Sequence, residues 1–207
     1  MDFSIKSFDT KNAIGQFKSA CIAVGIFENG KLSAAAKSLD TKGAVSGAIK
    51  SGDISGKAGS TLLLHAPAGT AAERIVLIGM GAEDKVSDRN FISAVQAAGR
   101  VFATLGANDA LLALPLDAAT GRDSDWAIRT AAITLRENLF RSDELKSQKD
   151  NNKGGVKKLA FAVDASHAAA AKAALAQGVA LANGMDLAKN LGNLPPNICT
   201  PTYLATT

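Results

Sequence analysis

The sequence contains little of what disulfide-stabilised and zinc-binding proteins need. Its two cysteines, Cys21 and Cys199, lie in an apolar run and in a proline-rich tail, and this spacing gives neither a disulfide framework nor a zinc ligand set. Its two histidines, His65 and His167, have no acidic residue or cysteine nearby at metal-ligand spacing. We therefore expect reduced thiols and two histidines that lie at the surface or in loops.

The sequence also lacks a long hydrophobic run. No apolar stretch approaches the roughly 20 residues that a membrane-spanning helix needs. Met1 to Phe8 alternates apolar and polar residues, whereas a signal peptide has a charged segment followed by an apolar one. These absences predict a cytoplasmic protein with no membrane partner.

The composition is that of a folded protein. Hydrophobic residues make up 47% of the chain and charged residues 20%, close to the averages for globular proteins. A length of 207 residues fits one core with a connecting element. The net charge of +4 favours solubility and a loose attraction to polyanions, but it does not by itself indicate nucleic-acid binding.

The first half of the chain predicts short strands and small helices. Met1 to Phe8 and Ala20 to Phe27 are β-like, and the second is nearly continuous in apolar residues, as in a strand that is covered on both faces. We expect these opening strands to make the sheet mixed. Two glycine-punctuated segments, Lys31 to Leu39 and Lys42 to Lys50, predict short helices.

The second half alternates strands with amphipathic helices. The helices are expected from an N-cap at Ser87, with a stripe of Ile92, Val95, Gly99, Phe102 and Leu105, and from about Ser124 to Arg141. Strands are expected at Thr61 to His65, Arg74 to Gly79, Ala110 to Leu114 and Val156 to Val163. This order implies right-handed crossovers and an α/β fold with a mixed, largely parallel sheet.

The end of the chain predicts a connecting helix and a linker. Ser166 to Leu191 is rich in alanine, with a narrow polar line that indicates contacts on several sides. Pro195 and Pro196 follow it in a semi-rigid linker, and Thr200 with Pro201 then forms a helix start. We expect a domain over residues 1–165, a connecting helix over 166–192, and a linker with the start of a further domain over 193–207.

Two glycine-rich segments resemble nucleotide-binding loops but do not meet their requirements. Ser51 to Ala58 is one residue short of a P-loop, lacks the magnesium-binding hydroxyl and leads into a strand, so we interpret it as a turn with a solvated lysine. Gly79-Met80-Gly81 lies at a strand end but lacks the third glycine of a dinucleotide fingerprint. A tight strand exit explains it better, with a small-ligand crevice at this strand end as the alternative.

The polar stretch at residues 141–158 predicts a basic loop. Its six cationic residues are Arg141, Lys146, Lys149, Lys153, Lys157 and Lys158. Such a loop can contact DNA phosphates without reading sequence, although a solvated loop is the more common outcome and no aromatic residue interleaves to stack on bases. Elsewhere the sequence offers no nucleophile elbow and no paired carboxylates, so we expect no catalytic or metal-binding residue in this chain.

Residues 183–205 carry a specific resemblance. The run NLPPNICTPTYLA at residues 193–205 strongly resembles the segment that joins the two domains of leucyl (cytosol) aminopeptidases. Residues 52–57 and 74–81 are similar, in the same order, to parts of that family's N-terminal domain. The resemblance thus spans the whole chain. It implies that the chain is the N-terminal domain of a leucyl aminopeptidase, truncated before the catalytic domain.

The resemblance implies a three-layer, macro-domain-like αβα fold on a long connecting helix. In that family a C-terminal peptidase domain releases N-terminal amino acids from peptides, with a water activated by two divalent metals, manganese or zinc. The metal-binding stretch NTDAEGRL is expected beyond Thr207, so no residue of this chain inherits a catalytic role. The resemblance also implies a hexameric parent, and DNA binding occurs in some bacterial members.

Overall fold

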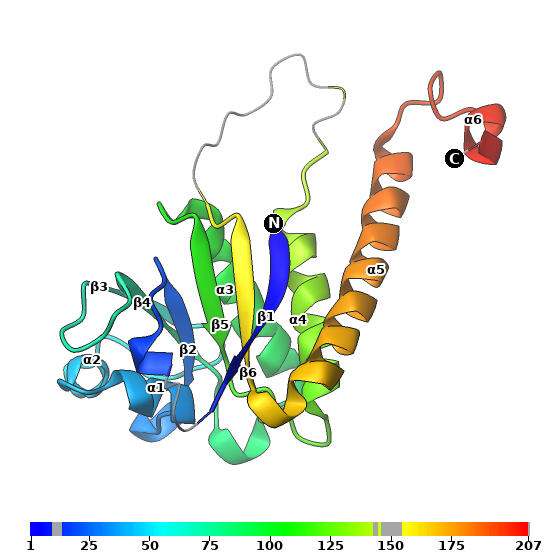
Figure 1. The fold of residues 1–207 in the computed structure, drawn as a ribbon. Coiled ribbons are helices and arrows are strands. Elements are labelled where there is room, and N and C mark those ends of the chain that lie inside the picture. Colours follow the sequence, from blue (N-terminus) through cyan, green and yellow to red (C-terminus); the bar gives the residue numbers. More distant parts are fainter. Residues whose placement is uncertain (10–13, 143–144, 146–154, 207) are drawn as a thin grey trace.

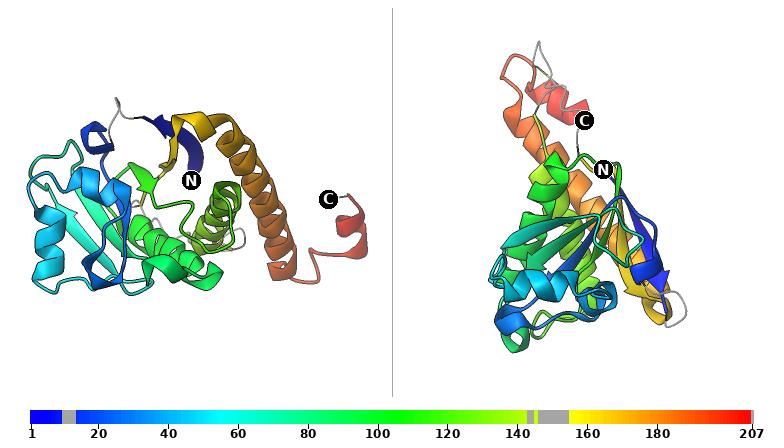
Figure 2. Two further views of the ribbon diagram at one scale, coloured as in Figure 1. Left: turned by 90° about the horizontal axis from the view of Figure 1, so that it is seen from below. Right: turned by 90° about the vertical axis from the view of Figure 1, so that its left-hand side faces the viewer.

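The chain folds into three layers, with helices on both faces of one sheet (Figures 1 and 2). The computed structural model describes all residues except 10–13, 143–144, 146–154 and 207. Six strands form the sheet in the order β1-β6-β5-β2-β4-β3. The expected three-layer, macro-domain-like α/β architecture is therefore confirmed.

The sheet is parallel except at one edge. The strands are β1 (Asp2–Phe8), β2 (Ile22–Ile26), β3 (Thr61–His65), β4 (Arg74–Gly79), β5 (Asp109–Ala113) and β6 (Lys158–Asp164). Only the β3–β4 pair is antiparallel among the described pairs. The sheet is mixed as expected, but the attribution to the opening strands was wrong. β1 and β2 pair in parallel because their partners return through crossovers, whereas β3 leads into β4 through a short loop.

The helices divide between the two faces of the sheet. They are α1 (Ala34–Leu39), α2 (Ala44–Lys50), α3 (Asp88–Thr104), α4 (Ser124–Leu139), α5 (Ala168–Asn193) and α6 (Pro201–Thr206). Alternate residues of β2 point to opposite faces. Ala23, with Cys21 just before the strand, belongs to the core under α3, α4 and α5, and Ile22 and Val24 belong to the core under α1 and α2. All five residues of β2 are buried, which confirms its expected central place.

Backbone contacts move several element starts from their expected positions. The first short helix does not begin at Lys31, because the carbonyl of Lys31 accepts a hydrogen bond of 2.8 Å from the Phe27 amide and turns the chain back along β2. It begins at Ala34, after Ser33 caps the amide of Ala36. Ser87 caps α3 as expected, but Ile92 is only partly buried and Phe91 faces the core instead.

The helix α5 runs alongside α4, and its C-terminal end extends past the end of α4 (Figure 1). Its buried residues all lie between Ala171 and Ala182. The polar line expected on this helix partly faces α4, where Arg136 donates to Asp186 at 2.7 Å and to Asn183 at 3.1 Å. Beyond that contact Leu187 is 48% exposed. The second half of α5 is therefore held by polar contacts rather than by burial.

Candidate functional site

A hollow lies at the carboxyl edge of the parallel strands. Neighbouring strands β2 and β5 send the chain to opposite faces here, since α1 follows β2 on one face and α4 follows β5 on the other. Open α/β sheets bind ligands at such a switch point. The hollow has a volume of about 760 Å³, within the range of small-molecule sites. It is the candidate functional site of the fold.

Apolar side chains form most of the lining of the hollow. They come from the ends of three strands, from the short helix η1 (Ile14–Gln16), from the loop after β5 and from the start of α1. They are Phe8, Ile14, Ala34, Ala35, Ala113, Leu114, Pro115, Leu116, Ala162 and Val163. The polar lining consists of Asp9, Ser33, Ser38, Asp117, Ser124, Asp164 and His167. The hydroxyl of Ser33 is already engaged as the cap of α1. An apolar wall with a few polar groups is typical of ligand pockets.

His167 and Asp125 form a contact at the rim of this hollow. Nε2 of His167 lies 2.9 Å from Oδ1 of Asp125. The contact joins the first turn of α4 to η4 (Ala165–His167), the short turn that leads into α5. The sequence did not reveal this pair, because the two residues lie 42 positions apart. His167 is thus a loop histidine, as expected, and it has a carboxylate partner.

The carboxylate of Asp164 stays ionised to a lower pH than usual. The hydroxyl and then the backbone amide of Ser166 donate to it and lower its pKa. Asp9 and Asp117 add two further carboxyl groups to the lining. Carboxylates repel a pyrophosphate, so this hollow favours uncharged or cationic ligands. Within the described residues, no three potential metal ligands are grouped closely enough to hold one ion.

The expected glycine-rich loops pack against each other. The amide of Gly81 donates to the carbonyl of Gly56 at 2.9 Å, and that of Gly59 donates to Gly79 at 2.9 Å. A side chain on Gly79 would lie 2.0 Å from the Lys57 carbonyl oxygen. This packing confirms the turn and the tight strand exit. The Gly79-Met80-Gly81 segment does not line the hollow at the carboxyl edge, so the small-ligand alternative moves to the strand ends that do.

The basic loop is only partly described. Lys146, Lys149 and Lys153 lie outside the described residues. Arg141, Lys157 and Lys158 are exposed and frame the loop between α4 and β6, at the opposite edge of the sheet from the hollow. The amides of Lys157 and Lys158 both donate to the Asn108 carbonyl, at 2.9 and 3.0 Å. The C-terminal end of the loop is therefore anchored beside the start of β5.

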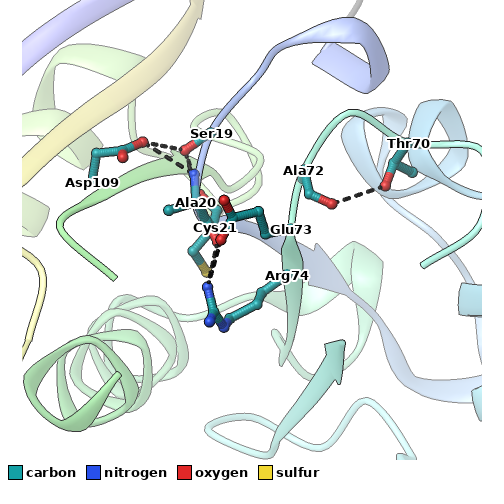
Figure 3. Close-up of polar contacts among 8 residues, drawn as sticks. All are labelled: Ser19, Ala20, Cys21, Thr70, Ala72, Glu73, Arg74 and Asp109. Atoms are coloured by element: carbon teal, nitrogen blue, oxygen red, sulfur yellow. Dashed lines mark hydrogen bonds and ion pairs between the residues drawn. The ribbon is translucent and has the colours of Figure 1, made fainter. Parts of the chain in front are cut away.

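A polar cluster lies at the start of strands β2, β4 and β5 (Figure 3). Oδ2 of Asp109 accepts hydrogen bonds from the Ser19 hydroxyl at 2.8 Å and from the Ala20 amide at 3.2 Å. Nη1 of Arg74 donates to the Ala20 carbonyl at 3.4 Å. Beside them Cys21 is fully buried, and burial raises the pKa of its thiol to about 12. The cluster ties strands together and holds an unreactive thiol.

The comparison with known families decides the assignment. A sequence model described as the N-terminal domain of the cytosol aminopeptidase family matches residues 23–149. The chain belongs to the cytosol aminopeptidase family. This match begins at the second residue of β2 and includes the strands β3 to β5 and the helices α1 to α4. The resemblance read from residues 183–205 is thereby confirmed by a part of the chain that does not contain that run.

Curated relatives of the cytosol aminopeptidase family align with the whole chain. A probable cytosol aminopeptidase of Herminiimonas arsenicoxydans is 58% identical over 207 residues. Those of Paraburkholderia phymatum and Ralstonia pickettii are 46% and 45% identical. The chain covers 41%, 42% and 43% of these three relatives. It therefore spans less than half the length of the curated relatives that it matches.

Solved structures share the fold of this cytosol aminopeptidase domain. A tomato leucine aminopeptidase mutant has a TM-score of 0.70 at 23% identity, covering all of this chain and 41% of that one. The bottromycin maturation enzyme BotP, described in complex with Mn, has a TM-score of 0.66 at 21% identity and covers 91% of this chain and 35% of its own. At these identities the likeness supports the fold alone.

In the described part of the chain, no helix is both long and apolar enough to cross a membrane.

Proposed function

We propose that this chain is the non-catalytic N-terminal domain of a metal-dependent leucyl aminopeptidase. The match of residues 23–149 to the N-terminal domain of that family carries the proposal. In the parent protein, a C-terminal peptidase domain holds two divalent metals, manganese or zinc, and releases N-terminal amino acids from peptides in the cytoplasm. The present domain contributes to the hexameric assembly and to substrate access.

The exposed second half of α5 supports a partner in the parent protein. Leu181 is 56% exposed and Leu187 is 48% exposed on this helix. Leu204, in the helix α6 that follows the linker, is 52% exposed. Large apolar side chains that project from a helix are typical of an interaction surface. The parent's own peptidase domain is the partner that we propose for it.

An activity assay tests the non-catalytic role. The purified chain is incubated with leucine p-nitroanilide and manganese, beside the full-length parent as a positive control. We expect turnover by the parent, and none by the chain above a metal-only blank. Turnover by the chain that depends on protein concentration would contradict the proposal.

Matched substitutions test the role of α5 in the parent. Leu181→Asp and Leu187→Asp together should lower hexamer content and activity of the full-length protein, because they place charge in an apolar contact. Both residues are exposed in this chain, so its melting temperature should not change. Ala173→Asp, on the exposed side of the first half of α5, is the control. Equal effects of both changes on the parent would argue against a partner at Leu181 and Leu187.

The hollow at the carboxyl edge of the sheet favours a second candidate function, the binding of a small ligand by a macro-like domain. Its switch-point position supports this candidate, and calorimetry with ADP-ribose tests it. Ser124→Tyr fills the hollow with a larger side chain. Saturable binding heat in the original chain that is lost in this variant would support ADP-ribose as the ligand. We expect a titration without binding heat, because the carboxyl groups of Asp9, Asp117 and Asp164 repel the pyrophosphate of ADP-ribose. That result would exclude ADP-ribose as the ligand.

The basic loop gives a DNA-contact function as a further alternative. Its described members Arg141, Lys157 and Lys158 are exposed. Each phosphate contact should add about one unit to the slope of log affinity against log salt. Mobility shifts over a salt series compare the chain with a variant in which all six basic residues are alanine. Binding that survives this change with the same slope would reject the loop.

A further inference from the structure

The charged lining of the hollow at the carboxyl edge of the sheet is acidic. Its described residues include the carboxyl groups of Asp9, Asp117 and Asp164 but no lysine or arginine. The basic side chain of His167 already has a partner, since its Nε2 lies 2.9 Å from Oδ1 of Asp125. A ligand that complements this lining therefore carries positive charge.

Three helix N-termini meet at the hollow, and an N-terminus by itself favours an anion. The first-turn amides of α1, α4 and η4 already donate to side chains of this chain, namely Ser33, Asp123 and Asp164. Two of these three caps are carboxylates, which offset the positive end of their helices. The helix N-termini therefore do not reverse the acidic character of the hollow.

Asp117 is the lining carboxylate that the fold does not use. It is exposed in the loop after β5, and among the described residues its side chain has no hydrogen-bond or ion-pair partner. Asp164, in contrast, accepts from the amide and the hydroxyl of Ser166, and Asp9 has contacts of its own. An ammonium group offers three donors and a positive charge, so it is the group that Asp117 binds best.

The wall next to Asp117 is apolar. Leu114, Pro115 and Leu116 directly precede it in the chain, and all three line the hollow. The volume of about 760 Å³ has room for a branched aliphatic group beside them. Burial of such a group adds affinity in proportion to the apolar area that leaves water. The lining thus selects a positive charge and a hydrocarbon group in one ligand.

We propose that this hollow binds aliphatic primary amines, with the ammonium group at Asp117 and the hydrocarbon group against Leu114, Pro115 and Leu116. The proposal rests on the small-ligand function of the hollow and adds the chemical class of the ligand. A free amine and the amino terminus of a peptide offer the same chemistry, so the experiment includes a probe for each source.

Probes with one carbon skeleton separate the effect of charge from that of shape. The isotope-labelled chain is titrated with isoamylamine, isoamyl alcohol and isovalerate, and NMR shifts of the Leu116, Asp117 and Ser124 amides report binding. The amine should bind about fivefold more tightly than the alcohol, as expected for an ion pair at an exposed carboxylate. Isovalerate should bind more weakly than the alcohol. Methylamine, which has the charge but little hydrocarbon, should bind at least about tenfold more weakly than isoamylamine.

Leucinamide identifies the source of the amine, because its amino group lies beside a carbonyl group as at the start of a peptide. Tighter binding of leucinamide than of isoamylamine would identify a peptide amino terminus as the ligand. Weaker binding would identify a free amine.

A matched pair of variants tests the place of the ammonium group. Asp117→Asn keeps the shape of the side chain and removes its charge, so the preference for isoamylamine over isoamyl alcohol should fall below about twofold. Asp2→Asn removes the same charge at the opposite edge of the sheet, where β1 begins, and should leave the preference unchanged. A preference that survives Asp117→Asn, or isovalerate binding as tight as that of isoamylamine, would overturn the proposal while the hollow remains a small-ligand site. If no probe shifts the three amides, the small-ligand function of the hollow fails as well.

Discussion

The hydroxyl of Ser19 donates a hydrogen bond of 2.8 Å to Oδ2 of Asp109, which lies 90 positions later in the chain. The same oxygen accepts the amide of Ala20 at 3.2 Å. Ser19 is 4% exposed, so its hydroxyl has little access to water. One carboxylate therefore satisfies two donors where β2 and β5 begin, and it fixes the start of both strands (Figure 3).

Asp109→Ala should lower the free energy of unfolding by about 1 to 3 kcal/mol, because it leaves the Ala20 amide without its acceptor. The Ser19 hydroxyl would keep the Cys21 carbonyl, 3.0 Å away, as an acceptor. Urea unfolding followed by circular dichroism measures the change. Asp117→Ala is the control, since Asp117 is exposed in the loop after β5 and should cost less than about 0.5 kcal/mol. Equal losses in the two variants would show that the Asp109 contact contributes no specific stability.

The helix α5 contains two glycines with opposite surroundings. A Cβ on Gly178 would lie 3.0 Å from backbone atoms of Arg129 in α4, whereas one on Gly184 would meet nothing within 4 Å. Gly184→Gln should therefore stabilise the chain by roughly 0.5 to 1 kcal/mol through helix propensity. Gly178→Gln should destabilise it by roughly 3 kcal/mol, because the two helices must separate. Thermal unfolding compares the variants, and a gain at both positions would refute the close helix contact.

The buried thiol of Cys21 predicts a loss of stability at high pH. Its pKa is raised from 9.0 to about 12, chiefly by burial. Above pH 9 the unfolded chain releases this proton and the folded chain keeps it. The thiol's stabilising effect is thus complete below pH 9 and is lost between pH 9 and about 12, at about 1.4 kcal/mol per pH unit.

Unfolding of the original chain and of Cys21→Ala at about pH 8 and pH 10 isolates this effect. The substitution should lower stability at the lower pH, because it leaves a small cavity. It should also make the decline toward high pH shallower. Cys199→Ala, outside the core, controls for the loss of a thiol. Parallel pH profiles for the original chain and Cys21→Ala would contradict the raised pKa.

Local sequence signals predicted much of the sheet and several helix ends. The bounds of β3 and β4 agree with Thr61 to His65 and Arg74 to Gly79, because runs of apolar residues between turn residues specify a strand directly. Ser87 and Thr200 were identified as N-caps from the residues that follow them, and each accepts the backbone hydrogen bond of a cap. Strands and helix ends that are specified by neighbouring residues can therefore be predicted from the sequence.

Features that depend on distant residues were not predicted. The expected strand from Val156 begins two residues later, because the Val156 amide donates to the Phe102 carbonyl at 2.9 Å. The antiparallel direction of β3 depends on the path of the loop to β4, which has no strand signal of its own. In the candidate site, the hollow is lined by residues from six separate segments between Phe8 and His167. No short sequence motif indicates that these distant residues lie together in the fold.

The ion pair between Arg136 and Asp186 predicts how the second half of α5 is held. Nη2 of Arg136 lies 2.7 Å from Oδ2 of Asp186, and the two side chains are 28% and 21% exposed, respectively. Screening by water is only partial at such a site, so the pair should contribute more than a fully exposed one. Arg136→Ala should leave the first half of α5 packed and should loosen the helix beyond Ala182, where no described residue is fully buried.

Hydrogen exchange with mass spectrometry measures this difference along α5. We expect at least a severalfold faster exchange of amides in residues 183–193 of Arg136→Ala, and unchanged exchange in residues 168–182. Arg129→Ala is the matched control, because Arg129 contacts Gln177 at 3.3 Å in the packed half. A uniform change along the helix would show that Arg136 stabilises the whole domain, since local anchoring affects only amides beyond the contact.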